Sequence, residues 1–314
     1  MQLNKNSKIF VAGHRGMVGS AILRFFKKKG YKKIFTANRK NVDLTNQLQT
    51  KNYLNKIRPN FVIIAAAKVG GILSNNMFKG DYIYQNIMIQ TNLIHSSYLV
   101  GVKKLIFLGS SCVYPKYSKQ PIKESELLSG KLEETNDAYA IAKISGVKMC
   151  ESYNKQFKTN YLCLMPTNLY GVNDNYDLKT SHFYSALLKK IYLAKKQRKK
   201  SVEIWGNGSA KRELLYVDDL ANACEFFLKK KIKHNIINIG SGDEKTIKEY
   251  FKFLIKKIGV NLNPKFDKTK PNGTPRKILD TSLAKKYGWT PSIDLDLGFE
   301  LTYKDFLDKI SKKK

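Results

Sequence analysis

The chain has 314 residues and 42% hydrophobic content, which allows two domains with at least one sizeable core and excludes intrinsic disorder over most of its length. Its 57 Lys and Arg against 25 Asp and Glu give a formal net charge of +32, which raises the question of a nucleic-acid partner. Only seven of those cations are arginine, so a diffuse, solvated lysine surface is the better explanation and no nucleic-acid partner is predicted.

The first half of the chain alternates short apolar runs with helical patterns, in which apolar residues recur at intervals of three and four. The predicted strands are Lys8–Ala12, Lys33–Ala37, Phe61–Ala67, Leu105–Gly109 and Tyr161–Met165, and the predicted helices are Ser20–Lys29, Asn86–Val100 and Tyr139–Lys155. This alternation predicts an α/β fold with a Rossmann-type, doubly wound parallel sheet.

After Pro166 the rhythm of the chain changes. One long amphipathic helix is predicted over Ser181–Lys200, followed by a short strand over Val202–Trp205. The segment Lys265–Arg276, which contains two prolines, is predicted to be an ordered loop or lid of the kind that carries function.

These patterns suggest a division into two domains. We expect residues 1–166 to form the dinucleotide-binding domain, with the segment 214–240 packing back against it. Residues 167–314 are then expected to form mainly a smaller C-terminal α/β domain that binds the substrate.

A glycine-rich loop follows the first predicted strand. Ile9–Ala12 runs into Gly13, Gly16 and Gly19, and a helix is predicted to begin directly afterwards. Such glycines let the backbone turn tightly and approach a pyrophosphate, while the helix N-terminus faces the anion. The strand before and the helix after make dinucleotide binding a better interpretation than a plain tight turn.

The residues after the second predicted strand favour NADP over NAD. An Asp or Glu at the strand end would bind both ribose hydroxyls of NAD, but Asn38, Arg39 and Lys40 stand there instead. The nearest acid, Asp43, comes later in the chain. Together with Arg15 in the glycine loop, Arg39 offers positive charge to a 2′-phosphate; the alternative is that both arginines are simply solvated.

A second constellation predicts carbonyl chemistry. Tyr139 and Lys143 project from one face of a predicted helix. The lysine charge is expected to lower the pKa of the tyrosine toward neutrality and make it a usable proton donor or acceptor. Ser110 follows a strand at the sheet edge where such folds bind ligands, so it can hydrogen-bond the same carbonyl oxygen.

The four cysteines, Cys112, Cys150, Cys163 and Cys224, form no CxxC pair and have no histidine at metal-ligand spacing. Neither a metal site nor a disulfide framework is predicted, and a reducing compartment fits best. The N-terminus enters a strand pattern without a signal-peptide stretch, and no apolar run is long enough to span a membrane. We therefore expect a soluble, cytoplasmic protein without a membrane partner.

These motifs together resemble the extended short-chain dehydrogenase/reductases, and the glycine loop, Ser110, Tyr139 and Lys143 carry that likeness. Within this group the chain is similar to the GDP-L-fucose synthases over nearly its whole length. The most specific segments are AAAKVGGI at 65–72, FLGSSCVYPK at 107–116, YAIAKI at 139–144, MPTNLYG at 165–171 and KPNGTPRK at 270–277.

The resemblance implies an NADPH-dependent enzyme that acts on GDP-4-keto-6-deoxy-D-mannose by 3,5-epimerisation and then 4-keto reduction in one site. It implies that Cys112 and His182 are the acid/base pair for epimerisation, and that Ser110, Tyr139 and Lys143 serve catalysis at the carbonyl. Without the resemblance, Cys112 would be interpreted as a small buried residue and His182 as a surface histidine or helix cap.

The resemblance also implies which residues bind the ligands. Those for the GDP-sugar are Lys190, Trp205, Arg212 and Asp280. Lys190 stands where relatives can carry Arg, and a lysine cannot make the planar bidentate contact. Those for NADP(H) are Gly13, His14, Arg15, Gly16, Met17, Val18, Gly19, Arg39, Leu108, Gly109, Ser110, Lys143, Pro166, Thr167, Asn168, Leu169 and His182.

Two other interpretations stay open. Another NAD(P)-dependent nucleotide-sugar epimerase, reductase or dehydratase would share Tyr139 and Lys143 but gives no reason for the pair Cys112 and His182. A regulatory or nucleic-acid-binding Rossmann protein without catalysis would have no chemical need of the serine, tyrosine and lysine together. Analogy with relatives further suggests a homodimer, formed through a pair of helices from each chain.

Overall fold

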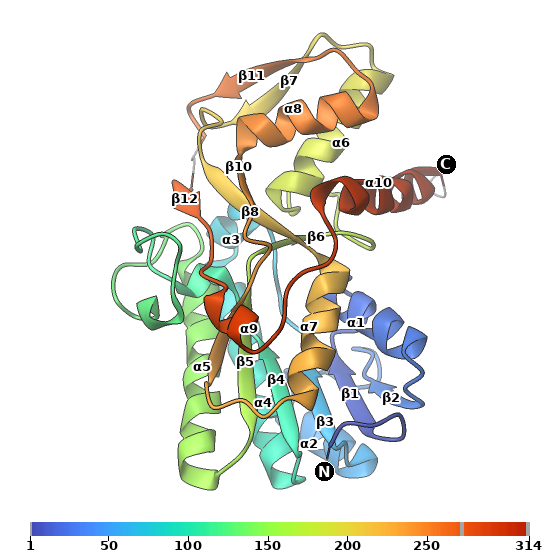
Figure 1. The fold of residues 1–314 in the computed structure, drawn as a ribbon, viewed down its shortest axis with the longest axis vertical. Coiled ribbons are helices and arrows are strands. Elements are labelled where there is room, and N and C mark those ends of the chain that lie inside the picture. The colour runs from blue at the N-terminus through green and yellow to red at the C-terminus, as the bar shows by residue number, and fades with distance from the viewer. Residues whose placement is uncertain (1, 271–272, 312–314) are drawn as a thin grey trace.

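The computed structural model describes residues 2–270 and 273–311. Figure 1 shows two regions stacked along the long axis of the molecule: a sheet flanked by helices, and above it a smaller region built mainly from the second half of the chain. The predicted α/β fold class with a Rossmann-type parallel sheet is confirmed, because six strands form one parallel sheet between helices.

The strands of the main sheet follow the order β2, β1, β3, β4, β5, β9. Buried Val, Ile, Leu and Phe run along the central strands almost without interruption, as a sheet covered on both faces requires. The bounds are β1 Lys8–Ala12, β2 Lys33–Thr36, β3 Phe61–Ile64, β4 Lys104–Leu108, β5 Tyr161–Pro166 and β9 Ile236–Ile239.

Helices cover both faces of this sheet. On one face α1 packs against α7, and on the other α4 packs against α5 and α2. The bounds are α1 Met17–Lys28, α2 Gln47–Ile57, α3 Ile72–Met77, α4 Lys79–Leu99, α5 Asp137–Phe157 and α7 Val217–Lys229. α7 and β9 come from the second half of the chain, yet they pack on α1 and pair with β5 in the main sheet.

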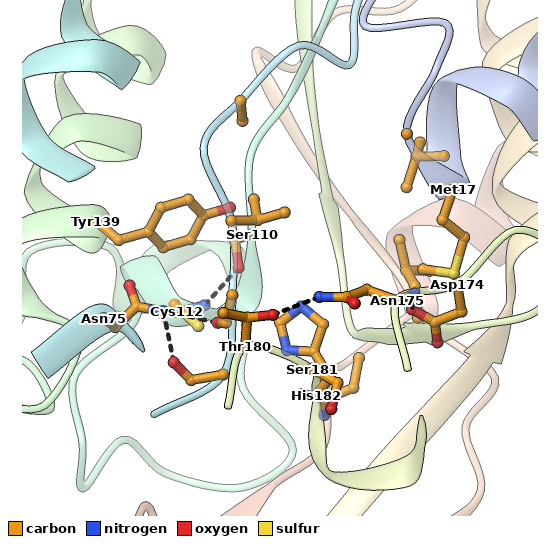
Figure 2. Close-up of a pocket in the computed structure, with 18 of the residues that line it drawn as sticks. Met17, Asn75, Ser110, Cys112, Tyr139, Asp174, Asn175, Thr180, Ser181 and His182 are labelled. Carbon is orange, nitrogen blue, oxygen red and sulfur yellow. Dashed lines mark hydrogen bonds between the residues drawn. The ribbon is translucent and has the colours of Figure 1, made fainter. Parts of the chain in front are cut away.

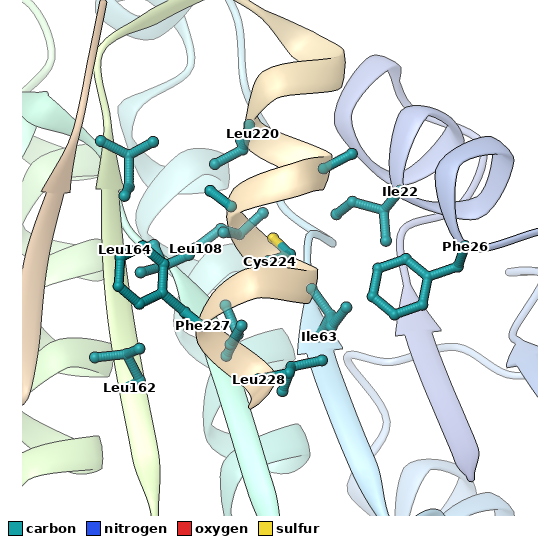
Figure 3. Close-up of a cluster of buried hydrophobic side chains, with 14 of the residues drawn as sticks. Ile22, Phe26, Ile63, Leu108, Leu162, Leu164, Leu220, Cys224, Phe227 and Leu228 are labelled. Atoms are coloured by element: carbon teal, nitrogen blue, oxygen red, sulfur yellow. The ribbon is translucent and has the colours of Figure 1, made fainter. Parts of the chain in front are cut away.

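A large apolar core lies between α7, α1 and the sheet. Figure 3 shows Leu220, Cys224 and Phe227 of α7 on the side that faces α1 and the strands, with Ile22 of α1 opposite them. All four side chains are fully buried. Because such interiors are close-packed, this core fixes α1 on the sheet and with it the glycine loop that precedes the helix.

The order of strands reverses between β1 and β3. β2 lies on one side of β1 and β3 on its other side, so the loops after β1 and β3 lead in opposite directions along the sheet. Open α/β sheets bind ligands in the crevice between two such loops. At their base the two loops touch. A Cβ on Gly13 would lie 2.6 Å from the backbone nitrogen of Ala66, and Gly13 has a φ of +89°, so only glycine fits there.

The smaller region is organised around β8, which pairs with β6, β10 and β12, while β7 pairs with β11. Its own apolar cluster fills the space between α6, α8 and α10. The bounds are β6 Asn168–Tyr170, β7 Ser201–Trp205, β8 Lys211–Tyr216, β10 Glu244–Thr246, β11 Asn263–Asp267, β12 Arg276–Lys277, α6 Phe183–Lys196, α8 Ile247–Ile258, α9 Ser282–Lys286 and α10 Leu295–Ser311, with two short 3₁₀ helices, η1 Ser111–Val113 and η2 Glu124–Glu126.

Some predicted boundaries are wrong, each for a physical reason. α4 begins at Lys79 rather than Asn86, because Tyr82 is the one buried residue among positions 79–85, so this part of the helix shows no apolar pattern. α6 ends at Lys196 rather than Lys200, since Arg198 adopts a left-handed conformation with a φ of 52°.

The loop predicted over Lys265–Arg276 is wrong at both ends, because β11 continues to Asp267 and β12 begins at Arg276. Residues 271–272, within this loop, lie outside the described residues. No helix among residues 2–270 and 273–311 is both long and apolar enough to cross a membrane. Over the same ranges, no three or more His, Cys, Asp or Glu side chains gather closely enough to hold a metal ion. The four cysteines carry free thiols, and Cys112 alone among them is partly exposed.

Candidate active site

One cavity of about 920 Å³ opens where the strand order reverses. The loops after β1, β3 and β4 and one face of α5 form one wall, and the segment before α6 together with β7 and β8 forms the other. Every predicted catalytic and cofactor-binding residue lines it, as do Lys190, Trp205 and Arg212. Its size is within the range of small-molecule and cofactor sites.

Asp280 is the exception among the predicted site residues, because it does not line the cavity. Its carboxylate accepts a hydrogen bond from the backbone N–H of Ser282 at 2.8 Å, and its own N–H donates to the Ile122 carbonyl at 2.8 Å. Asp280 therefore fastens the start of α9 to the loop around Ile122. Its predicted contact with a GDP-sugar finds no support in this geometry.

The loop between β1 and α1 fits a pyrophosphate. The N–H of Gly16 donates to the Gly13 carbonyl at 3.1 Å and closes the turn. A Cβ on Gly16 would meet no protein atom nearer than 3.6 Å, so the absence of a side chain leaves room for a ligand at the mouth of α1. No side chain caps that helix and its first turn holds no acid, so its free N–H groups and positive dipole end are available to an anion.

Arginines gather at the end of β2, where the adenine ribose of a bound dinucleotide is expected. Arg15 and Arg39 both line the cavity. The Arg39 side chain is 73% exposed, and its Nε lies 3.9 Å from a carboxylate oxygen of Asp43, a contact too open to hold it firmly. Both guanidinium groups can therefore turn toward a phosphate.

The serine, tyrosine and lysine meet at the carboxyl end of β4. Ser110 hydrogen-bonds the Tyr139 hydroxyl, and Figure 2 shows the two side chains close together. The Lys143 ammonium donates to the Leu108 carbonyl at 2.7 Å. The Lys143 nitrogen lies 5.9 Å from the centre of the Tyr139 ring. Burial lowers the pKa of Lys143 to about 8.

The prediction that Lys143 brings the pKa of Tyr139 toward neutrality is wrong. Desolvation by burial raises the pKa of Tyr139 above its ordinary value, and the neighbouring Cys112 adds to this, while the hydrogen bond with Ser110 opposes it. Tyr139 is consequently a neutral phenol near pH 7. That is the form which can donate a proton.

Cys112 and His182 approach the same space from different elements. Cys112 lies in η1, next to Ser110, and His182 is the N-cap residue of α6. Figure 2 shows Cys112 beside Ser110 and Tyr139, with His182 on the separate segment that leads into α6. His182 is exposed and lines the cavity, and desolvation by the surrounding protein, with the charge of Lys277, lowers its pKa.

The far wall of the cavity suits a nucleotide. The Lys190 ammonium lies 5.7 Å from the centre of the Trp205 ring and donates to the Glu203 carbonyl at 3.0 Å. The Lys270 ammonium lies 5.9 Å from the same ring. A partly exposed indole that lines a cavity beside cationic groups can pack against a base or sugar while the cations face phosphates.

Residues 9–240 match the model of the NAD dependent epimerase/dehydratase family. The chain belongs to this family. It is 46% identical to GDP-L-fucose synthase 1 of Arabidopsis thaliana, over 99% of this chain and 96% of the relative. It is 44% identical to the GDP-L-fucose synthase of Escherichia coli, over 96% of this chain and 97% of the relative.

A solved structure shows the same fold with its cofactor. The crystal structure of a GDP-L-fucose synthetase from Naegleria fowleri bound to NADP has a TM-score of 0.90 and 26% identity, covering 99% of this chain and 97% of that one. The resemblance to GDP-L-fucose synthases predicted from the sequence motifs is thus confirmed.

Asn136 and Lys277 also line the cavity, and both contact Cys112. Neither residue is predicted from the sequence. The Asn136 amide donates to the Cys112 sulfur at 3.4 Å, and the Lys277 ammonium donates to it at 3.6 Å. Lys277 closes the KPNGTPRK segment, which could have drawn attention to it, although it lies beyond the stretch that the family model matches. Asn136 lies just before α5 and carries no signal of its own.

Proposed function

We propose that this enzyme converts GDP-4-keto-6-deoxy-D-mannose to GDP-L-fucose, with NADPH as the reductant and with epimerisation at C3 and C5 preceding reduction at C4. One observation carries the proposal: Ser110 and Tyr139 share a single cavity with Cys112, His182 and the dinucleotide loop. A 4-keto group can serve there first as the electron sink for epimerisation and then as the target of reduction. The names of the most similar relatives support the choice of sugar.

Epimerisation requires a base and an acid on opposite faces of the sugar ring. The Cys112 thiolate takes the proton from C3 or C5, and the C–H electron pair moves to the 4-keto oxygen to give an enolate. The hydroxyls of Ser110 and Tyr139 hydrogen-bond that oxygen and stabilise its charge. The protonated fraction of His182 returns a proton to the other face of the carbon, and the lowered pKa of this residue makes its imidazolium a stronger acid.

Reduction uses the same oxygen. Bound NADPH supplies the hydride for C4. Tyr139 donates its phenolic proton to the alkoxide that forms, which its raised pKa permits because the proton is still present at neutral pH. With a pKa of about 8, Lys143 is mostly cationic at pH 7 and stabilises the tyrosinate that remains.

The two regions divide the binding work in this proposal. Residues 1–166 hold NADPH through the glycine loop, and residues 167–314 contribute most of the GDP-sugar site. Trp205, Lys190 and Arg212 support this division, since all three line the cavity from elements of the smaller region, namely β7, α6 and β8. Lys190 then neutralises diphosphate charge without a bidentate contact.

The activity is tested by mixing the purified protein with NADPH and GDP-4-keto-6-deoxy-D-mannose. We expect the absorbance of reduced cofactor to fall and GDP-L-fucose to form, identified by NMR of the product sugar. A product reduced at C4 with its C3 and C5 configurations retained would make the enzyme a simple C4 reductase. No oxidation of NADPH above background would overturn the proposal.

Cofactor preference gives a separate prediction. Replacing Arg39 by Asp should lower kcat/KM for NADPH about tenfold or more and leave that for NADH nearly unchanged, because a charge-assisted contact with the 2′-phosphate is lost and a repulsive charge is added. The matched control is Lys40→Asp, since Lys40 is adjacent and does not line the cavity. An unchanged ratio of the two kcat/KM values in Arg39→Asp would mean that Arg39 is merely solvated.

The enzyme is further proposed to be a homodimer. Tyr84 of α4 and Ile141 of α5 are 62% and 47% exposed on helices that pack side by side, which suits a helix-pair interface. Sedimentation velocity is expected to give twice the 35.9 kDa chain mass, and Ile141→Glu to give the monomer. The control Leu48→Glu places the same charge on α2, at a side chain that is 65% exposed, and should leave the dimer intact. A monomeric wild-type protein at micromolar concentration would contradict this part of the proposal.

A further inference from the structure

The sulfur of Cys112 is surrounded by hydrogen-bond donors. The Asn136 amide nitrogen lies 3.4 Å from it and the Lys277 ammonium nitrogen 3.6 Å. An ammonium has three N–H groups and no lone pair, so it can interact favourably with a thiolate but cannot accept a hydrogen bond from a thiol. Donors at this distance favour the ionised form of the cysteine.

The fold holds Lys277 in this position. In β12 it lies opposite Arg212 of β8, and side chains alternate from one face of a strand to the other. The preceding Arg276 pairs with Glu244, with 2.7 Å between its guanidinium nitrogen and the carboxylate oxygen, whereas Lys277 lines the cavity and is partly buried. Its charge is therefore fixed beside the sulfur rather than free in solvent.

Three other charged side chains lie near Cys112 or interact with its neighbours, namely Arg212, Glu133 and Lys116. Arg212 interacts electrostatically with Cys112 and also with Glu133. Glu133 has a further cation of its own, because the Lys116 ammonium lies 3.0 Å from its carboxylate oxygen. The carboxylate thus has two cationic partners, whereas the Lys277 ammonium hydrogen-bonds the sulfur directly.

Two titratable groups share the cavity with this thiol. Tyr139 is a neutral phenol near pH 7 because burial raises its pKa. The usual partner of a reactive thiolate is an imidazolium, but burial and the charge of Lys277 lower the pKa of His182 and so disfavour its charged form. An uncharged ring cannot supply a standing counter-charge.

We propose that Lys277 is the counter-ion that keeps Cys112 ionised as a thiolate, and that it is a positioning residue for the base of the epimerisation. The purpose assigned to the ion pair rests on the proposed function, whereas the pair itself is a property of the protein that can be measured without any substrate. The same lysine separates the two members of the acid/base pair electrostatically, since one positive charge favours a thiolate and disfavours an imidazolium.

The rate at which iodoacetamide alkylates Cys112 reports its thiolate directly. The rate is measured as a function of pH by mass spectrometry of the peptide that contains this residue. Cys150, Cys163 and Cys224 are buried, so their alkylation should be slow and is recorded on separate peptides. In the wild-type protein we expect the midpoint of the profile below that of an ordinary cysteine, which is about 8.5. A wild-type midpoint at or above this value would overturn the proposal without recourse to any variant.

The variant Lys277→Met removes the charge and keeps much of the side-chain length. Its alkylation profile should move about one pH unit upward, which makes the reaction at pH 7 roughly tenfold slower. Lys277→Gln should behave in the same way if the methionine variant folds poorly, and Lys277→Arg should restore a profile close to that of the wild type. The matched control Arg276→Met changes the adjacent residue of the same strand, which turns toward Glu244, and should leave the profile unmoved.

The outcomes separate this inference from the proposed function. An unshifted profile in folded Lys277→Met or Lys277→Gln overturns the inference, whatever the enzyme does to its substrate. A shifted profile supports it even if the protein proves not to epimerise sugars, in which case the proposed function fails and the ion pair stands. For an active epimerase, the same variants should slow deuterium exchange at C3 and C5 more than they slow reduction at C4.

Discussion

Replacing Tyr139 by phenylalanine is expected to lower kcat for NADPH oxidation by about two to four orders of magnitude. The hydroxyl bonds Ser110 and carries the proton that the alkoxide at C4 needs, and burial keeps that proton in place at neutral pH. The ring itself should not move, because it packs edge-on against Tyr82 with 6.4 Å between ring centres. Initial rates with both substrates saturating measure the effect, and KM for the sugar nucleotide should change little.

Tyr82→Phe is the matched control for this experiment. Tyr82 does not line the cavity, and its hydroxyl bonds the Ser74 hydroxyl at 2.8 Å, so its loss should leave kcat within a few-fold of the wild type. A Tyr139→Phe enzyme that kept more than about a tenth of the wild-type kcat would assign the proton to another donor. Retained NADPH binding in that variant would separate loss of proton transfer from collapse of the site.

The parts of this site that the sequence predicts well are local ones. Gly13 and Gly16 identify the phosphate loop because the strand before it, the turn and the helix after it follow one another in the chain, so neighbouring residues suffice. Even there the start of α1 is predicted too late, at Ser20 rather than Met17. A helix N-terminus that binds an anion lacks the side-chain cap by which helix starts are usually recognised.

The parts that the sequence misses are created by folding. Lys277 reaches Cys112 from a strand that pairs with β8, and no pattern within its own segment reveals that pairing. The sign of the pKa shift at Tyr139 is missed for a related reason. Its spacing to Lys143 is visible in the sequence, whereas the burial that raises its pKa depends on how α5 packs against β4.

Few of the positive charges behind the net charge of +32 have a role that the structure explains. Arg15 and Arg39 at the dinucleotide end, and Lys190 and Arg212 at the far wall, are the cations that the fold brings to the cavity for anionic ligands. Their importance follows from position and could not be read from a count of lysines. Long-range attraction of anions by the remaining surface would appear as a capture rate that falls with ionic strength.

Replacing Cys112 by serine is expected to slow solvent-deuterium exchange at C3 and C5 by about two orders of magnitude or more. A hydroxyl of nearly the same size fits the position, but its much higher pKa leaves no appreciable base at neutral pH, even beside Lys277. The measurement is made in D₂O without reductant, by NMR of GDP-4-keto-6-deoxy-D-mannose, so that epimerisation is observed alone. When NADPH is then added, oxidation should continue on the unepimerised ketone, because Ser110, Tyr139 and Lys143 are intact.

Cys224→Ala is the matched control, since it removes a buried thiol of α7 that packs in the core and does not line the cavity. It should cost some stability and leave exchange at both carbons unchanged. Exchange at the wild-type rate in Cys112→Ser would remove the cysteine from the mechanism and leave His182 to act as the base. Loss of exchange together with loss of NADPH oxidation would instead indicate a distorted site, and the Cys112 alkylation profile of the wild-type protein would then decide whether this residue is ionised as the mechanism requires.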